Sequence, residues 1–142
     1  MNPTKLWSVL FILFAVFSLQ AQEITDYDLQ NFARAYKDMV VLNTTAQKEM
    51  AKTISEEGLD LEVYHAIDAS KNSDYEPDVP QINFTKYDKI QPKIQQIQNK
   101  LETDVSKAYT KHDLTKQSYT AIAERVKQDY MLQAKLEQIM AK

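Results

Sequence analysis

Two histidines, His65 and His112, are the side chains of this sequence best suited to chemistry near neutral pH. A zinc site needs several converging ligands, and neither histidine belongs to an H-x3-H or H-E-x-x-H spacing. Both lie close to expected turns between helices. We therefore predict that they are surface histidines without a metal-binding or catalytic role.

A short acidic group, formed by Glu56, Glu57, Asp60 and Glu62, could serve as a Ca²⁺ loop or as a pair of acid–base carboxylates. Its spacing does not fit the D-x-[DN]-x-[DN]-G pattern of a calcium-binding loop. Negative charge is favourable at the N-terminus of a helix, and a second helix should begin here. The sequence therefore favours a structural role for these carboxylates.

Serine nucleophiles are not indicated either. None of the serines that follow residue 21 lies in a G-x-S-x-G or S-x-x-K motif. They are Ser55, Ser70, Ser73, Ser106 and Ser118. We predict no catalytic, cofactor-binding or metal-binding residue, and the sequence assigns no binding residue.

Eight tyrosines are the most unusual feature of the sequence. Most fall on or beside apolar stripes, where a ring packs at the edge of a core and its hydroxyl reaches a polar partner. These are Tyr36, Tyr64, Tyr87, Tyr109, Tyr119 and Tyr130. The alternative is an aromatic surface that binds a peptide or a glycan. Tyr27 and Tyr75 lie off the stripes and are freer to contact a ligand.

The composition narrows the classes of protein. The chain has 142 residues, 17 basic and 20 acidic side chains, one glycine and no cysteine. A single glycine argues against a glycine-rich phosphate loop, and the lack of cysteine excludes disulfides and thiolate metal sites. The mild acidity argues against nucleic acid as a ligand, because phosphate binding needs clustered positive charge. One domain is expected at this length.

Residues 1–21 have the pattern of a secretory signal peptide. Lys5 precedes an apolar run over residues 6–19, and Ala21 follows as a small residue at the expected cleavage site. The run is shorter than the roughly 20 residues that a membrane-spanning helix needs. We expect cleavage after Ala21 and export to the periplasm or beyond the cell, with an uncleaved anchor as the alternative. No membrane span is expected in residues 22–142.

The remaining residues, 22–142, show helical periodicity and no convincing strand, so the predicted fold class is all-α. The first helix should begin after a capping-box-like Thr25 and end at Gly58, and the second should begin at Asp60. These helices form hairpin one, residues 25–70. A linker at 71–84 contains Pro77 and Pro80, and hairpin two covers 85–141. Pro92 should lie in the first turns of the third helix or kink it.

The two halves resemble each other at an offset of 55 residues. The string Leu59, Tyr64, Ala66 and Ile67 matches Leu114, Tyr119, Ala121 and Ile122. We therefore predict a four-helix arrangement of two αα-hairpins related by a weak internal repeat. The third helix has a nearly heptad stripe that could pair within the chain or with a second copy, so the oligomeric state stays open.

Two segments, ITDYDLQNFARAYKDM at 24–39 and EEGLDLEVYHAID at 56–68, carry a family resemblance. The sequence resembles the domain of unknown function 4168 family. Matching positions of the first motif include Ile24, Asp26, Leu29, Phe32 and Tyr36, together with Thr25, Ala33 and Ala35. Matching positions of the second are Gly58, Leu59, Tyr64 and Ile67. The resemblance implies an exported bacterial protein with a helical fold and supplies no activity, cofactor or catalytic residue.

The expected function is therefore a non-enzymatic, exported helical domain that binds a protein or another component of the cell envelope. The first alternative is a periplasmic chaperone-like stress protein, because flexible methionines and tyrosines could hold unfolded chains. The second alternative is a hydrolase without a recognisable motif.

Overall fold

The computed structural model describes residues 23–142, and these residues form helices joined by short connections, without a strand. The helices are α1 (Asp26–Glu56), α2 (Leu61–Ser70), α3 (Gln81–Lys111), α4 (Lys116–Gln128) and α5 (Tyr130–Met140). The predicted all-α class is confirmed. None of these helices is both long enough and apolar enough to span a membrane. The predicted signal peptide, residues 1–21, lies outside the described residues.

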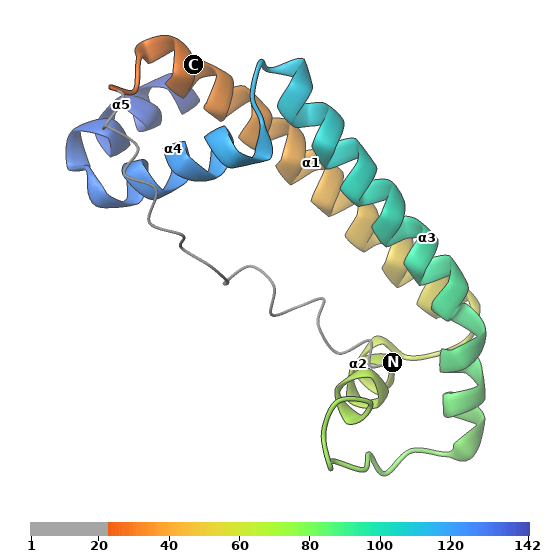
Figure 1. The fold of residues 1–142 in the computed structure, drawn as a ribbon. Helices are drawn as coiled ribbons and strands as arrows, with labels where there is room; N and C mark the ends of the chain where they lie inside the picture. Colours follow the sequence, from red (N-terminus) through yellow and green to blue (C-terminus); the bar gives the residue numbers. More distant parts are fainter. Residues whose placement is uncertain (1–22) are drawn as a thin grey trace.

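The two long helices, α1 and α3, lie side by side and form a rod (Figure 1). They run antiparallel, because Lys111 at the end of α3 reaches Asp38 near the start of α1, whereas Lys89 reaches Glu57 at the other end. The short helix α2 packs at one end of the rod, and α4 and α5 pack at the opposite end. The helices α2 and α4 each contact both long helices, and α5 contacts α1 and α4.

The beginning and end of α1 follow the sequence prediction. Thr25 is the N-cap: its side chain accepts from the Asp28 amide, and its own amide donates to the Asp28 carboxylate. After α1, Gly58 adopts a left-handed backbone with φ +70°. Asp60 then caps α2 by accepting a hydrogen bond from the amide of Glu62.

The third helix begins four residues earlier than predicted, at Gln81 instead of residue 85. The linker is therefore 71–80, and the prediction of 71–84 was wrong at its C-terminal boundary. Pro80 acts as the N-cap, a position at which the missing amide hydrogen breaks no helical bond, and its carbonyl accepts from Asn83. The early start brings Phe84 against the core beside α2.

Pro92 lies in the interior of α3, because the helix extends well ahead of it. A proline there removes one backbone hydrogen bond and pushes against the preceding turn. Figure 1 shows that α3 changes direction between its green N-terminal turns and the remainder. The neighbouring Ile90 and Ile94 are almost completely buried, so tertiary packing holds the bent helix in place.

The last predicted helix is two helices, and the expected total of four is therefore wrong. Asp129 leaves the helical conformation, with φ −122° and ψ 107°, and its carboxylate accepts from the amides of Met131 and Leu132 at the start of α5. Apolar residues keep their helical spacing on both sides of Asp129, so the sequence did not predict this break. Tyr130, which the periodicity placed on a stripe, is 79% exposed.

Two apolar cores lie at the two ends of the rod. Core 1, beside α4 and α5, is formed by Leu29, Phe32, Ala35, Met39, Ala108, Leu114 and Ile122. Core 2, beside α2, is formed by Ile54, Leu59, Tyr64, Ile67, Tyr87, Ile90 and Ile94. Burial of one large aliphatic side chain such as Leu29 or Ile67 is worth about 1.5–3 kcal/mol. Each end of the molecule thus has its own apolar cluster, and both clusters include residues of α1 and α3.

Members of the two cores stand 55 positions apart in the sequence. The pairs are Phe32 and Tyr87, Ala35 and Ile90, Met39 and Ile94, Leu59 and Leu114, and Ile67 and Ile122. The helices α1 and α3 have 31 residues each and begin at the same spacing. Asp113, 55 residues after Gly58, is the non-glycine residue with a left-handed backbone among the described residues, with φ +56°.

Candidate functional site

A polar joint at Asp38 ties the end of α3 to α1. One oxygen of Asp38, Oδ2, lies 2.8 Å from Lys111 Nζ and 2.8 Å from His112 Nε2. The His112 side chain is only 12% exposed. Hydrogen bonds from Lys111 and His112 lower the pKa of Asp38 below its ordinary value. In the following turn, the Tyr27 hydroxyl donates to Asp113 at 2.9 Å.

The opposite end of the rod is held by a different set of polar contacts. Lys86 Nζ donates to the carbonyl of Gly58 at 2.8 Å, and Lys89 Nζ lies 2.6 Å from Glu57. The Tyr87 hydroxyl donates to Asp68 on α2 at 2.6 Å. Burial and this bond to a carboxylate raise the pKa of Tyr87 well above its ordinary value. These contacts fix α2 and its preceding turn against α3.

Aromatic rings gather where α1, α3 and α4 meet. Phe32 and Tyr119 are stacked with ring centroids 4.5 Å apart, and Tyr109 lies 5.2 Å from Tyr119. Burial, with smaller contributions from Tyr109 and Tyr36, raises the pKa of Tyr119 to about 12. Tyr119 therefore remains protonated and acts through its ring, not as a base near neutral pH.

An apolar stripe runs along one face of α1 and leaves the core part of the way along the helix. Leu29, Ala33, Tyr36 and Val40 follow one another at helical spacing and share this face. Leu29 and Ala33 are buried, at 0% and 2% exposure, whereas Tyr36 and Val40 are 46% and 45% exposed. We call these four residues the α1 stripe. It is the feature of the described surface that most resembles a binding site, because large apolar side chains extend a core outward.

A family model described as "Domain of unknown function (DUF4168)" matches residues 25–136. The chain belongs to the DUF4168 family. The match begins at the N-cap residue Thr25 and extends into α5, so it includes both apolar cores of the DUF4168 domain. No curated protein and no solved structure matches the chain.

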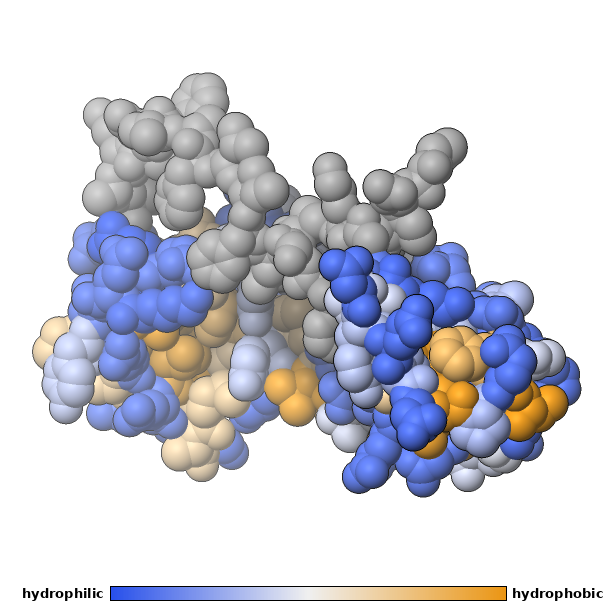
Figure 2. Space-filling view, turned by 90° about the horizontal axis from the view of Figure 1, so that it is seen from below, coloured by the Kyte–Doolittle hydropathy of each residue, from blue (hydrophilic) through white to orange (hydrophobic). Residues whose placement is uncertain are grey.

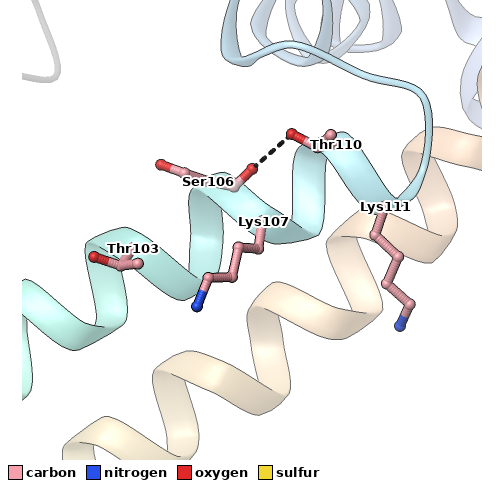
Figure 3. A pocket seen from close by; sticks show the side chains of 5 residues that line it. All are labelled: Thr103, Ser106, Lys107, Thr110 and Lys111. Atoms are coloured by element: carbon pink, nitrogen blue, oxygen red, sulfur yellow. Dashed lines mark hydrogen bonds between the residues drawn. The ribbon is translucent and has the colours of Figure 1, made fainter.

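Two recesses on the described part of the DUF4168 domain have little of the character of an active site. The larger is an open recess of about 610 Å³ along α3, lined by Thr103, Ser106, Lys107, Thr110 and Lys111 (Figure 3). Its hydroxyls donate to carbonyls of α3 itself, as the Thr110–Ser106 bond in Figure 3 illustrates. Lys111 extends toward α1, where it meets Asp38. The polar groups of this recess are thus engaged in the fold.

The smaller recess, of about 60 Å³, lies between α1 and α3 in the middle of the rod. It is lined by four pairs of residues spaced 55 apart: Leu42 and Ile97, Thr45 and Lys100, Ala46 and Leu101, and Glu49 and Asp104. Lys100 Nζ lies 2.8 Å from Asp104, and this hydrogen bond lowers the pKa of Asp104. The carboxylate thus already has a cationic partner from the neighbouring turn.

The histidines end in different surroundings. His65 is exposed on α2 and meets Tyr64 edge to face, with ring centroids 5.6 Å apart. His112 is the residue whose role the sequence missed, because it is nearly buried and bonded to Asp38, 74 residues away in the chain. The sequence carried no local signal for this pairing, since the two residues belong to separate helices.

The acidic group and the serines have structural contacts. Asp60 caps α2, Glu57 pairs with Lys89 across the two helices, and Glu56 lies 3.6 Å from Lys52 on the same helix. Ser118 completes a capping box with Thr115 at the start of α4. Within residues 23–142, no three histidine, aspartate or glutamate side chains come together as a group that could hold a metal ion.

The remaining tyrosines divide between core and surface. Tyr64 and Tyr87 lie in core 2 with centroids 5.1 Å apart, as the apolar stripes predicted. Tyr27 and Tyr75 are exposed, at 58% and 56%, which fits their position off the stripes. Figure 2 shows that hydrophobic groups reach the surface in several places on the face seen from below, separated by hydrophilic side chains.

Proposed function

We propose that this DUF4168 chain is an exported, non-enzymatic helical domain that binds a protein or another component of the bacterial cell envelope. The observation that carries the proposal is the α1 stripe, in which a buried apolar face continues into solvent at Tyr36 and Val40. Exposed apolar side chains that adjoin one another are a common mark of interaction sites.

Export is proposed from the sequence. Lys5, the apolar run at 6–19 and Ala21 form the order of a cleaved signal, and the family match begins just after them, at residue 25. The periplasm and the exterior of the cell are both compatible with a chain that has no cysteine. Fusion of residues 1–30 to a reporter that is active only outside the cytoplasm tests this part of the proposal.

The binding function is tested with a photo-activated cross-linker placed at Val40 and, in a matched control, at Lys52. Lys52 is on the same helix and its side chain is 75% exposed, but it lies off the α1 stripe. We expect the Val40 probe to give a discrete cross-linked product in envelope extracts and the Lys52 probe to give none. Equal labelling from both positions, or none from either, would contradict the proposal.

Two assays separate this function from its alternatives. A chaperone-like protein would suppress light scattering by an aggregating client at stoichiometric amounts, and we expect no suppression. A hydrolase that uses histidine would lose turnover when both His65 and His112 are replaced by Gln. We expect screens for hydrolytic turnover to stay flat with the natural chain.

We further propose that the two halves are an internal repeat of 55 residues. Support comes from the paired core residues, the equal lengths of α1 and α3, and the left-handed turns at Gly58 and Asp113. Asp adopts a left-handed backbone more readily than most residues, because its short polar side chain can form local hydrogen bonds. The fifth helix, α5, has no counterpart in the first half, where the equivalent positions are the linker and the start of α3.

A further inference from the structure

The helix α5 is the least buried helix of the described chain. None of its residues is buried, whereas each of the other four helices of the described chain has at least one buried residue; in α4 this is Ile122, at 7% exposure. Its apolar side chains Leu132, Leu136 and Ile139 pack against core 1 but remain partly exposed. Few buried contacts mark the segments that open first in a folded protein.

The connections of α5 allow it to move as a unit. Its N-terminus is Asp129, a single residue outside the helical conformation that ends α4 and caps α5. Its side-chain tie to α1 is the ion pair between Lys135 and Asp26, at 3.0 Å, with both side chains more than half exposed. Ion pairs exposed to this degree contribute little to stability. Core 2, at the opposite end of the rod, has no helix equivalent to α5 packed against it.

The surface beneath α5 is continuous with the α1 stripe. Lys135 of α5 meets Asp26, and the apolar residues of α5 pack on the cluster that contains Leu29, so α5 lies against the first turns of α1. From there the stripe continues through Ala33 to the exposed Tyr36 and Val40. The chain itself shows what this groove accepts: an amphipathic helix with apolar side chains at positions i, i+4 and i+7.

We propose that α5 is a displaceable cover, and that the groove it occupies on α1 and α4 receives an amphipathic helix of a partner protein. A partner helix longer than α5 would replace Leu132, Leu136 and Ile139 with its own apolar residues and would also cover Tyr36 and Val40. The identity of the competing helix, as part of a partner protein, rests on the proposed binding function. The opening of α5 does not depend on it.

The test uses the full chain and a fluorescent peptide of its own residues 129–142 as the probe. Because the sequence has no cysteine, α5 can be locked by changing Asp26→Cys and Lys135→Cys and joining the two thiols with a short bis-maleimide. We expect the peptide to bind the unbridged double variant and to lose binding when the bridge is formed. A peptide with Leu132→Asp and Leu136→Asp should bind neither form.

A charge variant tests the same opening without a cross-link. Lys135→Glu places a like charge beside Asp26 and should tighten apparent peptide binding by about 2- to 5-fold, because more of the protein is open. Lys52→Glu is the matched control, since Lys52 pairs with Glu56 within α1, at the end of the rod opposite α5. Hydrogen exchange should show the amides of α5 exchanging faster than those of α1 and α3.

Three results would overturn the proposal: equal peptide binding to the bridged and unbridged forms, no binding even to the Lys135→Glu variant, or exchange of α5 as slow as that of the long helices. These results are distinguishable from failure of the proposed function. The cross-linker at Val40 reports a partner on the exposed part of the stripe whether or not α5 opens.

Discussion

At the scale of single residues, Asp38 links two long helices through a single carboxylate. Its Oδ2 meets both Lys111 and His112, so one carboxylate connects α1 to the last turn of α3 and the residue after it. Charge-assisted hydrogen bonds of this kind are about twice as strong as neutral ones, but the 36% exposure of Asp38 allows solvent to screen them.

We expect Asp38→Asn to lower the free energy of unfolding at pH 7 by about 0.5–1 kcal/mol. Because the pKa of Asp38 is lowered in the folded state, its contribution is present above the ordinary carboxyl value of 3.8 and is lost as the pH falls through the folded value. Urea unfolding should therefore show a difference between the variant and the natural chain at pH 7 that shrinks as the pH falls below the ordinary carboxyl value of 3.8. Asp74→Asn, in the exposed linker, is the control and should change little.

An Asp38→Asn difference that is as large at pH 3 as at pH 7 would contradict this account. It would mean that the carboxylate acts through shape and not through charge.

At the scale of helices and turns, the two left-handed residues close the two long helices in the same way. The amide of Leu59 donates to the carbonyl of Ile54, and the amide of Leu114 donates to that of Tyr109. Such bonds satisfy carbonyls that a helix end would leave unpaired. The leucine of each turn is then directed into its core.

Replacing Gly58 by Ala should destabilise the domain by about 1–2 kcal/mol, because a Cβ disfavours the left-handed backbone. Crowding contributes little, since the new Cβ would lie 3.4 Å from the flexible end of Lys86. Thermal unfolding followed by circular dichroism measures the effect. Gly58→Asn is the matched control and should lower the stability of the domain less, because asparagine adopts the left-handed backbone more readily. A loss of stability as large as that of Gly58→Ala would point to crowding instead.

The sequence was a good guide to the elements that depend on local chemistry. The capping box at Thr25, the turn at Gly58 and the N-cap at Asp60 follow from residue types that satisfy nearby backbone groups, and the structure has all three. The break at Asp129 was missed because apolar spacing continues on both sides of it. An aspartate with helical spacing on both sides carries no local signal that distinguishes a cap from a position inside a helix.

The sequence also offered no basis for predicting contacts between residues that are far apart in the chain. His112 was predicted to be a surface residue without a role, and it lies beside Asp38 only because α1 and α3 run antiparallel in one register. The exposed end of the α1 stripe was missed in a similar way. Tyr36 fits the apolar periodicity as well as Leu29 does, and its exposure follows from where the short helices stop covering α1.

At the scale of the whole molecule, residues 26–70 and 81–140 are joined by the linker alone, yet each half completes the cores of the other. Core 2, for example, combines Ile54 of α1 with Ile90 of α3. An arrangement of this type can form equally well between two chains when the connection is too short to turn back.

Deleting residues 72–76 would join Lys71 directly to Pro77 and shorten the linker by half. We expect this variant to form a dimer in which the two chains exchange halves, because the same α1–α3 contacts are then made between copies. Light scattering coupled to size-exclusion chromatography should give a mass twice that of one chain of the variant. Replacing the same five residues by Gly and Ser without deletion is the control; a folded monomer from the deletion variant would refute the expectation.

The middle of the rod has a consequence for how the molecule melts. Between Met39 and Ile54 on α1 the one buried residue is Ala46, and α3 has none between Ile94 and Ala108. The two ends communicate through this thinly packed stretch, where the long helices face chiefly each other. We therefore expect the middle of the rod to set how cooperatively the two ends unfold: larger apolar side chains beside Ala46 should couple the two ends more tightly, and smaller ones should let each end unfold separately.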